Sequence, residues 1–354
     1  MDFFTDFFSF FLAKHLRRLY LYRKLTTIIS IFTQMIRFQI VGIKSEIQLM
    51  KNFWSAAAMI TATVIWGFAF SAQSSGMRFI DPMLFTALRS FAGALALIPV
   101  ILIFDLFSAG KISLWGSAQS ASEKKELFLG GSLCGLVISA ASICQQIGLK
   151  YTSAGKTGFL TALYIIIVPL MGIFFKKKIS PHLWIAVFLA LIGSYLLCGG
   201  ISSIGKGELF VILCAFIYSI HILVIDRYAP TCDCIRLSCI QFLWAAPLAA
   251  AASFIFQEPC IPDAIQAALP FWLFCGIGSS AIAFTLQMIS QKHLHPVTAS
   301  LLMSLESVFA LIGGCLFLHE SLSLQELSGC LIIFLSLTLP AFFHEKKSLA
   351  KKAK

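Results

Sequence analysis

Residues 296–320 have the sequence PVTASLLMSLESVFALIGGCLFLHE, and this segment decides how the rest of the chain is interpreted. About twenty of its residues are apolar or small, which is the length needed to cross the hydrocarbon core of a membrane. One carboxylate, Glu306, lies near its middle. A carboxylate at that depth is unfavourable unless it faces a cavity or a partner, so we expect Glu306 to belong to a functional site. A hydrogen-bonded structural glutamate is the alternative.

The composition is that of a membrane protein. Of the 354 residues, 58% are hydrophobic and only 12% are charged, whereas a soluble domain is about half apolar and about a quarter charged. The net charge of +11 would also suit a nucleic-acid-binding protein, but the basic residues lie at the chain ends and in alternate loops. We therefore expect an all-α membrane protein with no nucleic acid among its partners.

Ten apolar segments after Met50 are each close to the length that spans a bilayer. With a cytoplasmic N-terminus, the inner segments hold 22 Lys and Arg residues and the outer loops hold 4. Cytoplasmic loops show this bias, so both termini are predicted to be cytoplasmic. The expected spans are 53–72, 84–104, 127–147, 157–175, 182–199, 208–226, 235–256, 270–290, 297–318 and 325–343.

The two halves of the apolar region resemble each other. Gln146 and Lys150 precede the fourth span as Gln287 and Lys292 precede the ninth, at an offset of 141 to 143 residues along this part of the chain. Because each half has five spans, an odd number, the second half must enter the membrane from the opposite side. The sequence thus predicts two inverted five-helix repeats, with a substrate site near the middle of the membrane between them.

These features divide the chain into four expected segments. Residues 1–49 are a basic N-terminal extension, which either lies on the membrane surface or precedes a true start of translation at Met50. Residues 50–200 form the first repeat, residues 201–345 form the second, and residues 346–354 form a basic cytoplasmic tail.

Arg89 is a second ionisable residue inside an expected span. It could pair with Glu306, bind an anionic group of a substrate, or extend to the outer interface, and the sequence leaves these three roles open. Trp66, Phe70 and Gln73 are spaced i, i+4, i+7, so they share one face of the first span.

A ring of aromatic and amide groups around a cavity would suit a flat or cationic organic substrate, through stacking and cation–π contacts. Each such residue alone also fits ordinary packing between helices. The expected substrate-binding residues are Glu306, Arg89, Trp66, Gln73, Tyr164, Tyr218, His221 and Gln287.

The sequence gives no reason to expect a catalytic residue, a cofactor or a metal site. Gly155-Lys156-Thr157 resembles the end of a P-loop, but Lys150 stands where the first glycine would be. His221 and Asp226 are five apart on one helix, about 140° from each other, so they cannot act as a base and its orienting acid. The eleven cysteines include no CxxC pair, and eight lie in apolar spans, where they are expected as small buried residues.

Taken together, these residues resemble the EamA-type branch of the drug/metabolite transporter superfamily. The resemblance rests on Trp66-Gly67, on Pro82 with Arg89, on the motifs around the fourth span, and on Glu306, which stands where the family usually has a Glu-Pro pair. Ser307 replaces that proline, which puts a helix break beside Glu306 in doubt. The resemblance implies two bundles around a central cavity, alternating access, and a multi-pass location in the bacterial inner membrane.

One set within this family, from bacteria that live inside host cells, exchanges S-adenosylmethionine for S-adenosylhomocysteine. A cavity with one carboxylate, one arginine and several aromatic residues would fit a sulfonium cation with an amino-acid head and an adenine ring. The leading expectation is therefore an antiporter for S-adenosylmethionine uptake. An amino-acid or drug/metabolite exporter is the alternative, and a membrane-embedded transferase is a distant one. The expected partners are a small-molecule substrate and the lipid bilayer, with a homodimer left open.

Overall fold

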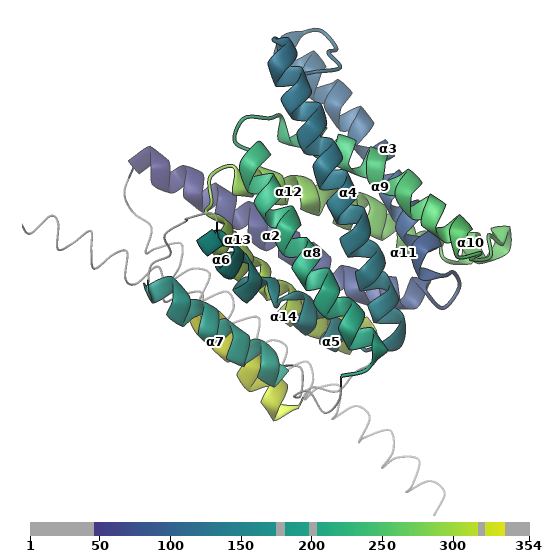
Figure 1. Ribbon diagram of the computed structural model, residues 1–354, viewed down its shortest axis with the longest axis vertical. Helices are drawn as coiled ribbons and strands as arrows, with labels where there is room; N and C mark the ends of the chain where they lie inside the picture. Colours follow the sequence, from purple (N-terminus) through teal and green to yellow (C-terminus); the bar gives the residue numbers. More distant parts are fainter. Residues whose placement is uncertain (1–45, 175–180, 198–203, 318–322, 337–354) are drawn as a thin grey trace, which may run out of the picture.

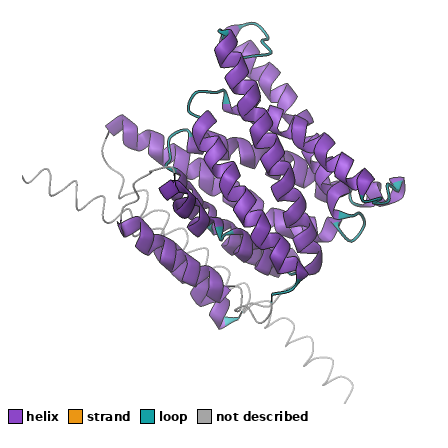
Figure 2. Cartoon of the chain, viewed as in Figure 1, coloured by secondary structure: helices purple, strands orange, loops and turns teal. Residues whose placement is uncertain are grey.

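The structure is a computed structural model of the chain, and it describes residues 46–174, 181–197, 204–317 and 323–336 (Figure 1). Within these ranges the regular elements are helices, and no strand occurs (Figure 2). The expected N-terminal extension and basic tail fall almost entirely outside the described residues.

The helices follow the order of the expected spans. The first half comprises α2 (Glu46–Gly76), α3 (Pro82–Ala109), α4 (Ala121–Tyr151), α5 (Ala154–Thr161), α6 (Tyr164–Phe174) and α7 (Pro181–Leu197). The second half comprises α8 (Lys206–Tyr228), α9 (Cys234–Ile255), α10 (Pro262–Ala267), α11 (Leu269–Phe274), the π-helix η1 (Cys275–Ala283), α12 (Phe284–Gln291), α13 (Pro296–Met303), α14 (Leu305–Phe317) and a last helix, Leu324–Ser336.

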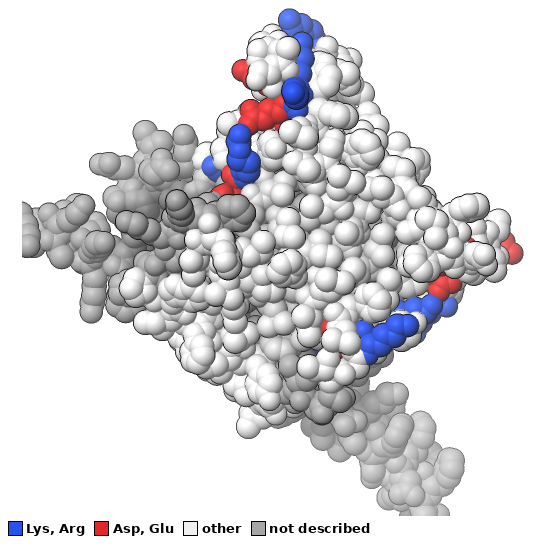
Figure 3. Space-filling view, viewed as in Figure 1, with Lys and Arg blue, Asp and Glu red and all other residues white. Residues whose placement is uncertain are grey.

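Among the described residues, eight helical segments are long and apolar enough to cross a membrane, and they coincide with the expected spans one to four and six to nine. Two shorter apolar helices, Leu183–Leu196 and Leu324–Ser336, coincide with the fifth and tenth, and each borders residues outside the described ranges. Charged side chains gather in two bands separated by a broad uncharged zone (Figure 3). The chain is therefore a multi-pass membrane protein.

One end of the bundle is fastened by acidic side chains between helices. Lys150 at the end of α4 forms an ion pair with Asp81, which precedes α3. Glu258 accepts hydrogen bonds from the backbone N–H groups of Met83 (3.2 Å) and Leu84 (2.7 Å) at the start of α3. We call this end, with loops 77–81, 152–153 and 256–261, the Asp81 face.

The opposite end has a buried ion pair. Arg236 of α9 binds both carboxylate oxygens of Asp105 in α3, at 2.6 and 2.7 Å, and it also binds Asp233 at 2.7 Å. The side chains of Arg236 and Asp105 are only 4% and 7% exposed. We call this end, with loops 110–120, 229–233 and 292–295, the Arg236 face.

The contacts between helices occur in matching pairs. α4 packs on α8, just as η1 and α12 pack on α2; α5 and α6 pack on α8, just as α13 and α14 pack on α2; and α3 packs on α9. α7 lies beside the last helix, where a Cβ atom at Gly193 would be 2.8 Å from the carbonyl oxygen of Gly329 (Figure 1). Exchanging the two halves of the chain turns each of these contacts into another contact that is present.

The fourth and ninth spans are each broken in the middle. α5 ends at Thr161 before α6, and α13 ends at Met303 before α14. Although Ser307 replaces the family's proline, the ninth span breaks two residues before Glu306. The hydroxyl of Ser304 donates to the carbonyl of Leu301 (2.6 Å), a local bond that competes with regular helix geometry.

Small residues bring α14 against α2. A Cβ atom at Gly67 would lie 2.2 Å from the Cβ of Phe309, and one at Gly313 would lie 3.0 Å from the hydroxyl of Ser71. Real Cβ atoms essentially never approach to 2.2 Å, and 3.0 Å is tighter than most of their contacts, so α2 and α14 depend on these glycines for their separation. The contact fixes where Glu306 is held.

Candidate functional site

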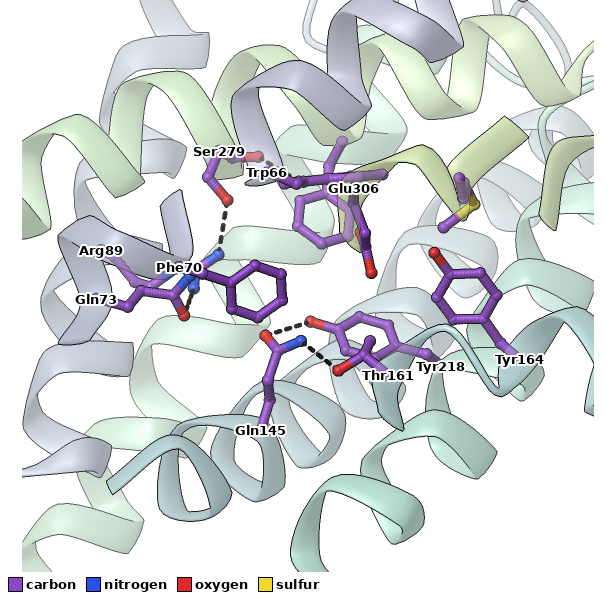
Figure 4. A pocket seen from close by; sticks show the side chains of 12 residues that line it. Trp66, Phe70, Gln73, Arg89, Gln145, Thr161, Tyr164, Tyr218, Ser279 and Glu306 are labelled. Atoms are coloured by element: carbon purple, nitrogen blue, oxygen red, sulfur yellow. Dashed lines mark hydrogen bonds between the residues drawn. The ribbon is translucent and has the colours of Figure 1, made fainter. Parts of the chain in front are cut away.

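A cavity of about 380 Å³, counting the part that opens to solvent, lies between the helices of the two halves. Figure 4 shows the side chains that line it. Its lining residues are Trp66, Phe70, Gln73, Arg89, Gln145, Thr161, Tyr164, Tyr218, Ser279, Phe284, Met303 and Glu306.

Arg89 is held by uncharged partners. Its Nη1 donates to Oε1 of Gln73 (3.0 Å), its Nη2 donates to the hydroxyl of Ser279 (3.0 Å), and its Nε donates to the hydroxyl of Ser280 (3.4 Å) (Figure 4). The residue is only 3% exposed, so it does not extend to the interface.

The ion pairs found among the described residues do not include Arg89. A guanidinium group carries five N–H donors, of which these three hydrogen bonds use three. A buried cation needs a compensating charge. In this geometry Arg89 neither pairs with Glu306 nor extends to the interface.

Glu306 is the second residue of α14 and is 5% exposed. Its carboxylate points into the cavity, with the hydroxyl of Tyr164 nearby (Figure 4). Neither Oε1 of Glu306 nor the Tyr164 hydroxyl completes a hydrogen bond with another described residue. The N-terminal end of α14 favours negative charge at this position. Glu306 therefore offers an acceptor to a cation or a hydrogen-bond donor inside the cavity.

Gln145 connects three helices at the wall of the cavity. Its amide nitrogen donates to the hydroxyl of Thr161 (3.2 Å), and its amide oxygen accepts from the hydroxyl of Tyr218 (3.4 Å) (Figure 4). The sequence analysis paired Gln287 with the neighbouring Gln146, whose side chain lies about 100° around the helix from that of Gln145. An offset of 142 between the two halves of the chain would instead pair Gln287 with Gln145.

Aromatic rings form the remaining wall. The ring of Trp66 lies 4.9 Å from that of Phe284, edge to face, and its Nε1 donates to the carbonyl of Ser279 (3.4 Å). Phe70 lies beside Trp66 in the lining (Figure 4). Rings held in this way present flat surfaces on which an aromatic solute can stack.

Six of the eight expected site residues line the cavity: Glu306, Arg89, Trp66, Gln73, Tyr164 and Tyr218. His221 and Gln287 do not. His221 is fully buried and its Nε2 lies 2.7 Å from Oε1 of Gln241, while Nε2 of Gln287 donates to Oε1 of Gln291 (2.9 Å). The lining residues that were not among the eight are Phe70, Gln145, Thr161, Ser279, Phe284 and Met303.

The π-helix η1 accounts for part of this difference. It replaces regular α-helix from Cys275 to Ala283, just before Phe284 and Gln287. A π-helical stretch shifts the phase of the residues that follow it, so a regular helical period cannot predict which side chain faces the cavity.

In the described part of the chain, no group of three His, Cys, Asp or Glu side chains is placed to hold a metal ion. The ten cysteines among the described residues are free thiols. Only Cys260 is exposed, in the loop of the Asp81 face.

Membrane-spanning helices around a cavity with buried charged groups define a class of polytopic membrane proteins that handle small solutes. The sequence model of the EamA-like transporter family matches residues 53–199 and again residues 205–341. The chain belongs to this family of transporters.

Two curated relatives are named as transporters. The chain is 25% identical over 300 residues to an uncharacterized transporter of Archaeoglobus fulgidus, covering 82% of this chain and 86% of that protein. It is 23% identical over 299 residues to the uncharacterized transporter YoaV of Bacillus subtilis, covering 82% and 98%. A crystal structure that is 19% identical in sequence superposes with a TM-score of 0.66 over 82% of this chain and 96% of the other, which supports the fold.

Proposed function

We propose that this chain is a secondary transporter that moves a small organic metabolite across the bacterial inner membrane by alternating access, and that it is not an enzyme. The family match and the names of the relatives support transport as the activity. In this proposal both termini are cytoplasmic, so that the Arg236 face is the inner one.

The proposal includes ten helices arranged as two inverted repeats, residues 50–200 and 201–345. The spacing between corresponding helix starts in the two halves supports this arrangement. The first residues of α3 and α9, Pro82 and Cys234, are 152 positions apart, and each follows an aspartate. The first residues of α5 and α13, Ala154 and Pro296, are 142 positions apart, and these helices have the same length. α7 and the last helix would be the fifth and tenth spans.

One observation carries the proposed substrate class. The cavity contains a cation, Arg89, with no carboxylate partner among the described residues, and a carboxylate, Glu306, with an unused oxygen. They come from different walls, with aromatic rings between them (Figure 4). A solute with an anionic group, a cationic group and a flat ring would satisfy all three features.

S-adenosylmethionine has these features and is our leading candidate, taken up in exchange for S-adenosylhomocysteine. Its carboxylate would bind the unused N–H groups of Arg89, its sulfonium would lie near Glu306, and its adenine would stack on the aromatic wall. S-adenosylhomocysteine lacks the sulfonium charge, so it would bind Glu306 less strongly than S-adenosylmethionine does and would be released.

Uptake of labelled S-adenosylmethionine into cells that express the chain tests this proposal. We expect uptake above an empty vector, stimulated by S-adenosylhomocysteine on the opposite side of the membrane. Glu306→Gln should insert normally and lose uptake, whereas Asp263→Asn, an exposed acid in α10, should not change it.

If uptake did not exceed that of the empty vector, S-adenosylmethionine would be excluded as the substrate. Efflux of amino acids or drugs from preloaded cells, independent of any counter-solute, would favour the exporter instead. Normal uptake by Glu306→Gln would remove this residue from the mechanism.

A further inference from the structure

A second group of buried polar side chains lies between the cavity and the Arg236 face. We call His221, Gln241, Gln287 and Gln291 the polar layer; each is at most 2% exposed. His221 lies in α8, seven residues before its end, and Gln241 lies in α9, seven residues after its start. Gln287 and Gln291 are the fourth and the last of the eight residues of α12. All four thus lie within about two helical turns of loops 229–233 and 292–295.

The polar layer holds α8, α9 and α12 together. Nε2 of His221 lies 2.7 Å from Oε1 of Gln241, so the imidazole N–H donates. Nε2 of Gln287 donates to Oε1 of Gln291, and Nε2 of Gln291 donates to the carbonyl of Ile222 (3.0 Å). These bonds join α8 to α9 and α12 to α8 on the Arg236 side of the cavity.

The layer nevertheless leaves much of its hydrogen-bonding capacity unused. Nδ1 of His221, Nε2 of Gln241 and Oε1 of Gln287 are buried without a hydrogen-bond partner in the described part of the chain. Buried polar groups in proteins are nearly always paired. Three such atoms in one layer provide donors and acceptors that a bound solute could use.

Only one thickness of side chains separates the layer from the cavity. The ring of Phe284 lies 4.9 Å from Trp66 on the cavity side and 5.8 Å from His221 on the other. The sulfur of Met303 accepts from Nε2 of Gln287 (3.8 Å). Phe284 and Met303 both line the cavity, so these two side chains separate the cavity from the polar layer.

The repeat offsets relate the layer to the cavity. An offset of 152 places Arg89 opposite Gln241, and an offset of 142 places Gln145 opposite Gln287. Arg89 and Gln145 line the cavity, whereas their two counterparts are in the layer. The layer therefore occupies, in the second half, the position that part of the cavity wall occupies in the first half.

We propose that the polar layer is the second half of the substrate site, which receives the uncharged, planar hydrogen-bonding groups of the solute when the cavity opens to the Arg236 face. This inference rests on the inverted repeats and the alternating access of the proposed function. Amide and imidazole groups match the edge of a purine or an amide, since each offers donors and acceptors in one plane. The position in the second half that corresponds to Arg89 is occupied by Gln241, which is uncharged. The polar layer therefore holds an anionic group less strongly than the cavity around Arg89 does.

Labelling of introduced thiols tests the inference without knowledge of the substrate. Gln241→Cys, Gln287→Cys and Gln291→Cys are made singly, and sealed membrane vesicles of each orientation are treated with a charged, membrane-impermeant methanethiosulfonate. The modified peptides are then measured by mass spectrometry. Native Cys260, exposed at the Asp81 face, reports the side that the reagent reaches and the correct insertion of each variant. Native Cys134, fully buried in an apolar cluster, is the control for protection.

We expect the introduced thiols to be modified at least about tenfold faster than Cys134, because transient opening brings them into water where thiolate can form. This modification should occur in the vesicles in which Cys260 is protected. Protection equal to that of Cys134 in both orientations would overturn the inference. Modification only from the side that labels Cys260 would overturn it as well.

A second measurement uses S-adenosylmethionine as the probe. Gln241→Leu with Gln287→Leu keeps the layer closed with apolar side chains of similar size. We expect its exchange to fall at least about tenfold, because the solute loses its hydrogen-bonding partners in the layer. Exchange at the rate of the wild type would contradict a role of the layer in the substrate site. If the wild type does not bind this probe, the proposed substrate fails while the labelling result still decides the inference.

Discussion

Removing Arg236 should destabilise the protein more than removing any exposed arginine. Its guanidinium makes five hydrogen bonds, to both oxygens of Asp105, to Asp233, and to the carbonyls of Ser113 (2.8 Å) and Leu114 (3.3 Å). In Arg236→Met the carboxylate of Asp105 stays buried with the N–H of Ser113 (2.9 Å) as its remaining hydrogen-bond partner. Breaking a buried ion pair from one side costs about 3–5 kcal/mol. We expect about 3 kcal/mol, because this N–H remains.

A double-mutant cycle isolates the pair. Replacing both residues, as Arg236→Met with Asp105→Leu, removes both charges, and such replacements are often close to neutral. The double variant should therefore be more stable than the sum of the single variants, with a coupling of about 2 kcal/mol. Unfolding in mixed micelles with increasing SDS, followed by tryptophan fluorescence, measures each free energy.

Arg227→Met is the matched control. Arg227 pairs with Glu126 at 3.1 Å, but its side chain is 67% exposed, and exposed pairs contribute about 0.2–1 kcal/mol. Equal costs for the two arginines, or additive effects of Arg236 and Asp105, would refute the view that this pair joins α3, α9 and the loop 110–120 at the Arg236 face.

Three further outcomes are expected. Arg89→Leu should weaken binding of S-adenosylmethionine about a hundredfold in equilibrium dialysis, because two charge-assisted hydrogen bonds together contribute about 3 kcal/mol; unchanged binding would place the anionic group elsewhere. Gly67→Ala should lower the free energy of unfolding by about 1–3 kcal/mol, since its Cβ atom would meet Phe309 at 2.2 Å, and a stability equal to that of the wild type would contradict the close α2–α14 contact. Gly155→Ala should leave the stability unchanged or raise it slightly, as nothing lies within 4 Å of its Cβ position, and a clear loss would show a contact that the geometry lacks.

The membrane-spanning pattern could be predicted from the sequence because it depends on the length of apolar segments alone. The shared face of Trp66, Phe70 and Gln73 could also be predicted, since α2 is a regular helix and its period places all three in the cavity wall. Glu306 was identified by the cost of burying a carboxylate, and it does face the cavity (Figure 4).

Other features depend on contacts between distant residues. The break at Ser304 occurs without a proline, and η1 changes the phase of the residues around Phe284. Arg236 was counted as one of many basic residues at a loop, because nothing in its neighbourhood indicates that Asp105, 131 positions away, is its partner. Gln145 needed the correct repeat offset to be distinguished from its neighbour.

Exchange of labelled S-adenosylmethionine by proteoliposomes is the most direct test of the central claim that Glu306 faces the solute in a cavity between two halves of a carrier. Wild type and Glu306→Gln are reconstituted in equal amounts, with S-adenosylhomocysteine on the opposite side. We expect exchange by the wild type and a rate at least about tenfold lower for the variant, a loss of ~1.4 kcal/mol or more. Exchange by Glu306→Gln at the rate of the wild type would contradict the account.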